Sequence, residues 1–133
     1  MKDNLFSCPV QIRMSDLDPF DHVNNGAQCN LFDYGRSLYF EHLFGTKIDW
    51  MTFDYVLVHV DMDFALPIRI HDTMECETEI TELGRSSVRM TQRLRNGTNG
   101  AVHTTCHAVL VRFDRQQLCS LEIPETHRAL FHS

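Results

Sequence analysis

A short stretch near the N-terminus decides the fold: RMSDLDPFDHVNN, residues 13–25. It gathers aspartates, a proline and asparagines within a few positions, which is typical of a loop. A half-buried strand precedes it, because apolar side chains there occupy alternate positions: Phe6, Cys8, Val10, Ile12 and Met14. A helical pattern follows it. The stretch is therefore predicted to connect a strand to a helix.

The predicted helix runs from Ala27 to about Phe44. Its apolar residues recur at spacings of three and four, which indicates an amphipathic helix: Leu31, Gly35, Leu38 and His42 share one face, with Phe32, Tyr39 and Leu43 beside it. Asn24 and Asn25 are good cap residues before it, and Gly45 ends it.

Four later segments have the alternating pattern of strands: residues 55–64, 74–80, 88–95 and 101–113. Residues 124–131 predict a short terminal helix. We therefore expect an α+β domain in which a five-stranded antiparallel sheet wraps around one long helix, with its last four strands forming a meander. Residues 109–111 are apolar on both sides, so we expect the helix to cover one side and a partner subunit the other.

The composition indicates a single domain, residues 1–133, with an ordinary balance of apolar and charged residues. The formal net charge of −6 disfavours a general nucleic-acid binder. No apolar run reaches the length of about 20 residues that spans a membrane, and no stretch has the form of a signal peptide. We therefore expect a cytoplasmic protein without membrane contact.

The cysteines and histidines predict neither disulfides nor a metal site. Five cysteines are widely spaced without a CxxC pair, so we expect reduced thiols. His103 and His107 lie four apart, but on a strand that spacing corresponds to about 13 Å, too far to share one ion.

The motif at residues 16–25 resembles the opening motif of the 4-hydroxybenzoyl-CoA thioesterase family, which has the hot-dog fold. That motif runs D-x-D-x-x-G-H-V-N-N before a long helix. Residues 32–36, Phe-Asp-Tyr-Gly-Arg, fit the family's pattern on that helix, and residues 123–125 fit its closing Ile-Pro-Glu. The resemblance covers nearly the whole chain. It is specific for the fold and weak on the substrate.

The resemblance implies that Asp18 attacks a thioester or activates water against it. The backbone N–H groups of Asn25 and Gly26, at the helix N-terminus, would stabilise the oxyanion. The alternative for Asp18 is an Asx-turn with its own loop. His22 either orients Asp18 or a water, or packs its ring and bonds a backbone carbonyl. We expect Asp16 to be a structural hydrogen-bond acceptor.

The chain departs from the family pattern at two positions. Asp21 replaces a glycine, and aspartate tolerates the left-handed backbone that such a turn requires. Gln28 replaces an aromatic residue that is often tyrosine. Gln28 lies in the first helical turn, where it either lines the acyl pocket or occupies a surface position of the helix.

Asp33 and Arg36 are three apart on the helix, so they can form a surface ion pair. The resemblance implies an alternative for Asp33, in which this acid on the helix reaches the active site. An arginine-rich stretch follows at residues 85–95. Arginine suits the phosphates of coenzyme A, but Glu75, Glu77 and Glu79 could pair across strands with Arg89 and Arg93. Arg85 lies at the turn, outside that pairing. We therefore expect Arg85, Ser86 and Ser87 to contact the nucleotide or pantetheine.

Taken with these residues, the resemblance implies an acyl-CoA thioesterase that needs no metal or redox cofactor. It also implies a homo-oligomer, a dimer or a tetramer of dimers, with active sites shared between subunits. Two alternatives remain open: a thioesterase acting on acyl-carrier protein, and a non-catalytic protein that binds acyl-CoA.

Overall fold

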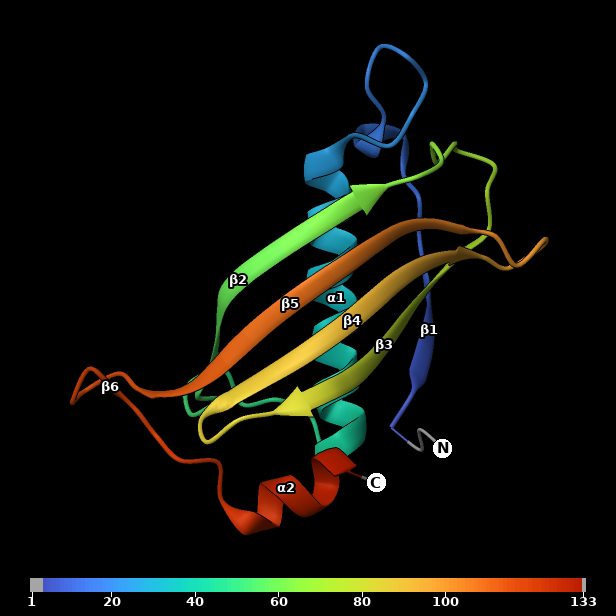
Figure 1. The fold of residues 1–133 in the computed structure, drawn as a ribbon. Coiled ribbons are helices and arrows are strands. Elements are labelled where there is room, and N and C mark those ends of the chain that lie inside the picture. The colour runs from blue at the N-terminus through green and yellow to red at the C-terminus, as the bar shows by residue number, and fades with distance from the viewer. Residues whose placement is uncertain (1–3, 133) are drawn as a thin grey trace.

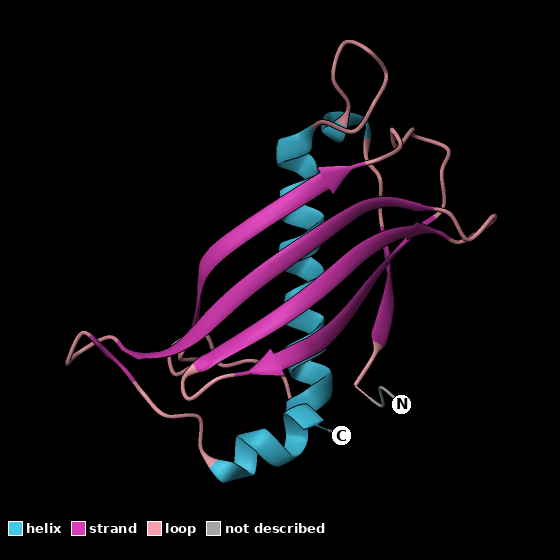
Figure 2. Cartoon of the chain, in the orientation of Figure 1, coloured by secondary structure: helices cyan, strands magenta, loops and turns pink. Residues whose placement is uncertain are grey.

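The computed structural model describes residues 4–132. One long helix lies against one face of an antiparallel sheet, and a short helix follows at the C-terminal end (Figures 1 and 2). The elements, in chain order, are β1 (Phe6–Val10), a 3₁₀ turn η1 (Met14–Asp16), α1 (Asn25–Phe44), β2 (Tyr55–Phe64), β3 (Met74–Leu83), β4 (Ser87–Asn96), β5 (Val102–Asp114), β6 (Cys119–Ser120) and α2 (Glu125–His132).

The strand order is β1-β3-β4-β5-β2, and the short β6 pairs with β5. The predicted α+β architecture is confirmed, but the predicted four-strand meander is wrong. Only β3, β4 and β5 follow one another across the sheet, whereas β2 pairs with the far side of β5. β2 is therefore an edge strand, and β1 takes the place beside β3.

The first strand ends at Val10, earlier than the alternation up to Met14 suggests. The backbone N–H of Arg13 donates to Asp16 Oδ2 at 2.9 Å, and the N–H of Asp16 donates back to the Arg13 carbonyl at 2.9 Å. These bonds close the η1 turn, which leaves Met14 75% exposed.

α1 begins at Asn25, two residues before the predicted start at Ala27, so Asn24 is the cap residue and Asn25 lies in the first turn. The Asn24 side chain accepts a hydrogen bond from the Ala27 N–H at 2.7 Å, and the helix ends at Gly45 in the left-handed region with φ of 71°. The buried face of α1 differs from the predicted one, since His42 is exposed and the centre of the contact is Phe32, Gly35, Arg36, Tyr39 and Phe40.

Gly35 allows α1 to approach β3 closely. A Cβ atom at this position would lie 2.4 Å from the Sγ of Cys76, well inside van der Waals contact. Any larger residue would therefore push the helix away from the sheet.

The inner face of β2 is only partly covered. A β-bulge between Leu57 and His59 shifts the alternation. Leu57, Val60 and Phe64 therefore pair with buried residues of β5 and face the same side as α1. They nevertheless remain 43%, 40% and 45% exposed. On β5, Leu110 is buried while Val109 and Val111 are half-buried.

Candidate active site

The loop between η1 and α1 is a closed hairpin. Leu17 and Val23 form an isolated antiparallel bridge, and the Asp18 N–H donates to the His22 carbonyl at 2.8 Å. Asp21 adopts a φ of 64°, so the expected left-handed turn forms with aspartate in place of glycine. The loop projects beyond the N-terminal end of α1 (Figure 1).

The Asp18 side chain forms an Asx-turn within its own loop, which was the alternative to a catalytic role. Its Oδ1 accepts hydrogen bonds from the N–H groups of Phe20 at 2.9 Å and His22 at 3.2 Å. The side chain is half-buried, and Oδ2 has no donor among residues 4–132. The same geometry therefore orients the carboxylate and leaves one oxygen available for chemistry.

His22 contacts Asp18 through its backbone. Its N–H binds the carboxylate, and its carbonyl accepts from the Asp18 N–H. The imidazole has no hydrogen bond within the described part of the chain. His22 thus helps to hold Asp18, but the ring contributes nothing to that contact.

Asn25 and Gly26 form the exposed first turn of α1. Their N–H groups have no acceptor among the described residues, as expected for the start of a helix. These donors and the positive end of the helix dipole can receive a developing negative charge.

The base of the loop is held by Asp16, whose predicted role as an acceptor is confirmed. Its carboxylate accepts from the backbone and the guanidinium of Arg13, and its carbonyl accepts from the Asn24 N–H at 2.9 Å. Burial alone would raise the pKa of Asp16, but the hydrogen bonds from Arg13 outweigh it and lower this pKa.

Gln28 does not occupy the surface position that was one of its two alternatives. It is 3% exposed, its Oε1 accepts from Thr104 Oγ1 at 2.6 Å, and its Nε2 donates to the Val23 carbonyl at 3.5 Å. Gln28 therefore joins the first turn of α1 to β5 and to the end of the loop.

Asp33 and Arg36 form the predicted ion pair, but it is not a simple surface pair. Asp33 is exposed, whereas the Arg36 side chain is 8% exposed and also donates to Gln92 Oε1 at 2.7 Å. In turn, Gln92 Nε2 binds the Phe32 carbonyl and Thr78 Oγ1, both at 3.1 Å. Arg36 is thus held inside the domain by hydrogen bonds to two elements.

Beside this ion pair lies a cavity of about 220 Å³ between α1, β2 and the segment before β2. Its wall is mainly apolar, with polar groups on one side: Asp33, Arg36, Ser37, Phe40, Ile48, Trp50, Phe53, Tyr55, Leu57 and Leu110. Apart from Asp33, the predicted site residues do not line it. The aromatic residues at 50–55 were the only sequence signal for this cavity, and their contact with Phe40 is long-range.

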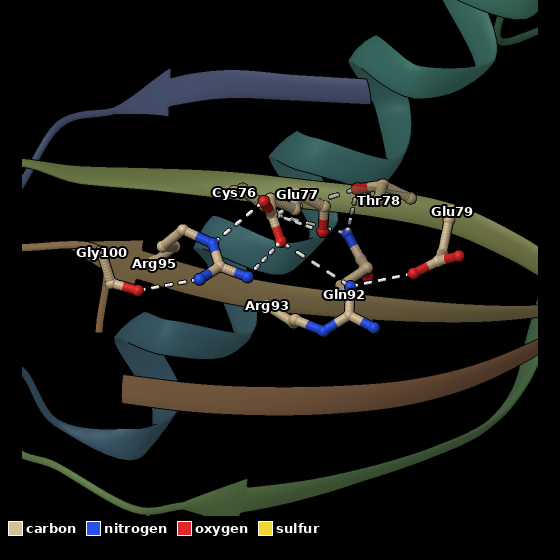
Figure 3. Close-up of polar contacts among 8 residues, drawn as sticks. All are labelled: Cys76, Glu77, Thr78, Glu79, Gln92, Arg93, Arg95 and Gly100. Atoms are coloured by element: carbon tan, nitrogen blue, oxygen red, sulfur yellow. Dashed lines mark hydrogen bonds and ion pairs between the residues drawn. The ribbon is translucent and has the colours of Figure 1, made fainter. Parts of the chain in front are cut away.

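The arginine-rich stretch is largely neutralised by the strand next to it. Arg93 pairs with Glu79 at 2.9 Å and Glu77 at 3.7 Å, and Arg95 pairs with Glu77 at 3.0 Å. Figure 3 shows both arginines reaching from β4 to the glutamates of β3. The cross-strand pairing that was the alternative for Arg93 forms, whereas Arg89 lies 3.8 Å from Glu82 and not beside Glu75, Glu77 or Glu79.

Arg85 forms no ion pair with residues 4–132, and its side chain is exposed. Its carbonyl and those of Ser86 and Ser87 accept backbone hydrogen bonds that close the β3–β4 turn and fix it to neighbouring segments. This turn lies near α2, at the end of the sheet opposite to the Asp18 loop (Figure 1). Within one chain, the predicted nucleotide contacts and Asp18 are not brought together.

Within residues 4–132, no three His, Cys, Asp or Glu side chains are arranged to hold a metal ion. In the same part of the chain, no helix has the length and apolar character to cross a membrane.

Comparisons with known proteins agree with this geometry. A sequence model of the Thioesterase superfamily matches residues 20–103. The acyl-CoA thioesterase YbgC of Haemophilus influenzae is 24% identical over 99% of this chain and 98% of the relative.

Two solved structures superpose closely on the chain. A thioesterase from Thermus thermophilus, complexed with coenzyme A and Zn, is 27% identical with a TM-score of 0.84 and covers 96% of this chain and 97% of its own. A 4-hydroxybenzoyl-CoA thioesterase mutant complexed with 4-hydroxybenzoyl-CoA is 18% identical, with a TM-score of 0.84, over 96% of this chain and 99% of its own. This similarity confirms the predicted hot-dog fold.

Proposed function

The chain belongs to the thioesterase superfamily, and we propose that it hydrolyses acyl-CoA thioesters to a free acid and coenzyme A, with Asp18 as the catalytic carboxylate. The observation that carries this proposal is the Asp18 loop, which holds an oriented carboxylate and leads directly into a helix N-terminus whose first N–H groups have no acceptor among the described residues. The names of the Haemophilus influenzae relative and the coenzyme A in the Thermus thermophilus structure support acyl-CoA as the substrate.

In the proposed reaction, Asp18 Oδ2 acts on the thioester in one of two ways. It either attacks the carbonyl carbon, giving an acyl-aspartate that water hydrolyses, or removes a proton from an attacking water. In both cases the carbonyl oxygen gains negative charge, which the N–H groups of Asn25 and Gly26 stabilise. The carbon–sulfur bond then breaks and coenzyme A leaves as the thiolate.

We propose that two copies pair through β2. One edge of β2 bonds to β5, and its other edge has no partner among the described strands. Beside that edge lie the partly exposed Leu57, Val60 and Phe64. An open edge next to apolar surface favours association. We expect a dimer, or a tetramer of dimers, by light scattering, and a monomer mass at micromolar concentration would refute this pairing.

Such a dimer gives Arg85, Ser86 and Ser87 a place in the site. Antiparallel pairing of β2 with its copy brings the β3–β4 turn of one subunit to the same end of the double sheet as the Asp18 loop of the other. An extended coenzyme A could then run from the loop of one subunit to the turn of its neighbour, where no ion pair within the described part of the chain competes for Arg85.

We place this activity in the cytoplasm, because all five cysteines are free thiols, as expected in a reducing compartment. Acyl-carrier protein is a weaker candidate substrate. Arg93 and Arg95, which an acidic carrier would use for docking, are already paired with glutamates.

Release of free thiol tests the proposed function. The purified protein should hydrolyse acyl-CoA at least about tenfold faster, by kcat/KM, than the same acyl group on acyl-carrier protein, a difference of about 1.4 kcal/mol. A higher kcat/KM on acyl-carrier protein than on acyl-CoA would instead identify acyl-carrier protein as the substrate. Tight binding of acyl-CoA without thiol release would identify a non-catalytic binding protein.

A further inference from the structure

The cavity beside α1 has the character of a binding site. It is a half-open pocket lined mainly by apolar side chains, with a few polar groups on one side, which is the usual lining of a site for a small molecule. Part of its wall consists of aromatic rings in mutual contact, since Phe53 packs edge to face on both Phe40 and Trp50, with ring centres 5.1 and 5.6 Å apart. This aromatic side of the cavity suits an uncharged, apolar ligand.

The distance from the N-terminus of α1 to the cavity sets how long an acyl chain must be to reach from one to the other. Asp33, at the near side of the cavity, is eight residues beyond Asn25, which corresponds to about 12 Å along the helix axis. Carbon–carbon bonds of about 1.5 Å advance an extended chain by roughly 1.3 Å each, so about nine carbons cover this distance.

The surface between the two places is compatible with a hydrocarbon chain. On α1, short side chains follow one another at spacings of three and four: Gly26, Cys29, Asp33 and Ser37. On β2, Leu57, Val60 and Phe64 face the same side and are partly exposed. A chain lying along β2 would contact these three apolar side chains.

We propose that this cavity binds the far end of a long, unbranched acyl chain, so that the substrate class is acyl-CoA of about 12 to 16 carbons. The inference rests on the proposed function. A cavity of about 150 Å³ accommodates benzene, so the 220 Å³ present here holds several methylene groups beyond the first nine carbons. Acetyl and butanoyl groups are too short to reach it.

The test compares acyl chain lengths in wild type and in a variant with the cavity filled. Ser37 lines the cavity, and among residues 4–132 its hydroxyl bonds only its own helix, through the Asp33 carbonyl. Ser37→Phe therefore adds bulk where the chain end should lie. Ser7→Phe is the matched control, because Ser7 is exposed on β1, outside the cavity. Trp50→Ala is a second cavity variant, which removes a wall instead of filling the space.

Each methylene that enters the cavity should raise kcat/KM by about fourfold, so tetradecanoyl-CoA should exceed decanoyl-CoA by on the order of 100-fold. We expect Ser37→Phe to lose most of this preference, Trp50→Ala to weaken it, and Ser7→Phe to keep it. Hydrolysis of butanoyl-CoA should stay within about twofold in all three variants, because butanoyl does not reach the cavity.

Equal kcat/KM values for wild type from butanoyl to tetradecanoyl would overturn this inference while leaving the thioesterase activity in place. So would a Ser37→Phe variant that loses activity equally on short and long chains. Failure of wild type to hydrolyse any acyl-CoA would instead overturn the proposed function, and this inference with it.

Discussion

The carboxylate of Asp18 is held by backbone N–H groups of its own loop, whereas that of Asp33, farther along α1, is paired with the buried guanidinium of Arg36. Both aspartates were candidates for the active site. A carboxylate bound to arginine has its charge shared in a strong, charge-assisted contact, which leaves it less able to attack carbon or accept a proton. A carboxylate oriented by amides through one oxygen keeps the other available.

The two regions also differ in what surrounds them. The Asp18 loop projects beyond the helix, close to free N–H donors, while Asp33 borders an apolar cavity. This difference suggests a division of roles, in which the loop end of α1 performs the chemistry and the middle of α1 selects the acyl chain. Substitutions can test the two regions separately.

The largest effect is expected at Asp18. Asp18→Asn removes the charge, and kcat should fall at least about 100-fold, the range for loss of a catalytic acid or base. The amide oxygen of asparagine can still accept from the Phe20 and His22 N–H groups. Thermal unfolding should therefore change little. Turnover near that of wild type would transfer the catalytic role to Asp33.

Gly35 tests the middle of α1 without touching the loop. Gly35→Ala places a Cβ 2.4 Å from Cys76 Sγ, and we expect the free energy of unfolding to fall by about 2 kcal/mol through overpacking. Gly26→Ala is the control, because its nearest contact would be Asn24 Oδ1 at 3.4 Å. Urea denaturation measures both variants. Equal stability of the two would show that the close approach of α1 to β3 is not required.

Arg85 tests the substrate end that is farthest from the chemistry. Arg85→Ala should raise KM about tenfold, equivalent to about 1.4 kcal/mol, with kcat nearly unchanged. An acyl-pantetheine substrate, which lacks the nucleotide, should not distinguish the variant from wild type. Equal impairment on both substrates would remove Arg85 from the nucleotide site.

The smallest effect concerns the base of the loop and depends on pH. The pKa of Asp16 is lowered in the folded protein, so its stabilising contribution is present above the unfolded pKa and is lost as pH falls below about 4. Asp16→Asn should therefore be less stable than wild type at pH 7, by about 1 kcal/mol. Urea denaturation should show a smaller difference in the free energy of unfolding between wild type and Asp16→Asn at pH 3 than at pH 7. If this difference in stability is the same at both pH values, the charge of the Asp16 carboxylate does not contribute to stability.

Local signals in the sequence predicted the loop end of α1 well. The cap at Asn24, the left-handed Asp21 and Gly45, and the acceptor Asp16 each depend on residues within a few positions of one another. The cross-strand ion pair of Arg93 also followed from alternation and a hairpin.

The sequence did not predict features that depend on contacts between distant segments. The edge position of β2 results from its pairing with β5, about 50 residues later, which alternation alone does not reveal. Gln28 is buried against Thr104, which donates to it from 76 residues away. The cavity requires Phe40, Trp50 and Leu110 to meet, and nothing in their local spacing indicates that they do.

The most direct test of this account is a single turnover with enzyme in excess, comparing Asp18→Asn with Asp33→Asn. Each variant is mixed with tetradecanoyl-CoA, and mass spectrometry measures the intact thioester after wild type has consumed its substrate. We predict that Asp18→Asn binds the substrate and leaves it intact, while Asp33→Asn hydrolyses it nearly as fast as wild type. Rapid hydrolysis by Asp18→Asn, with intact substrate on Asp33→Asn, would contradict the assignment of the chemistry to the Asp18 loop.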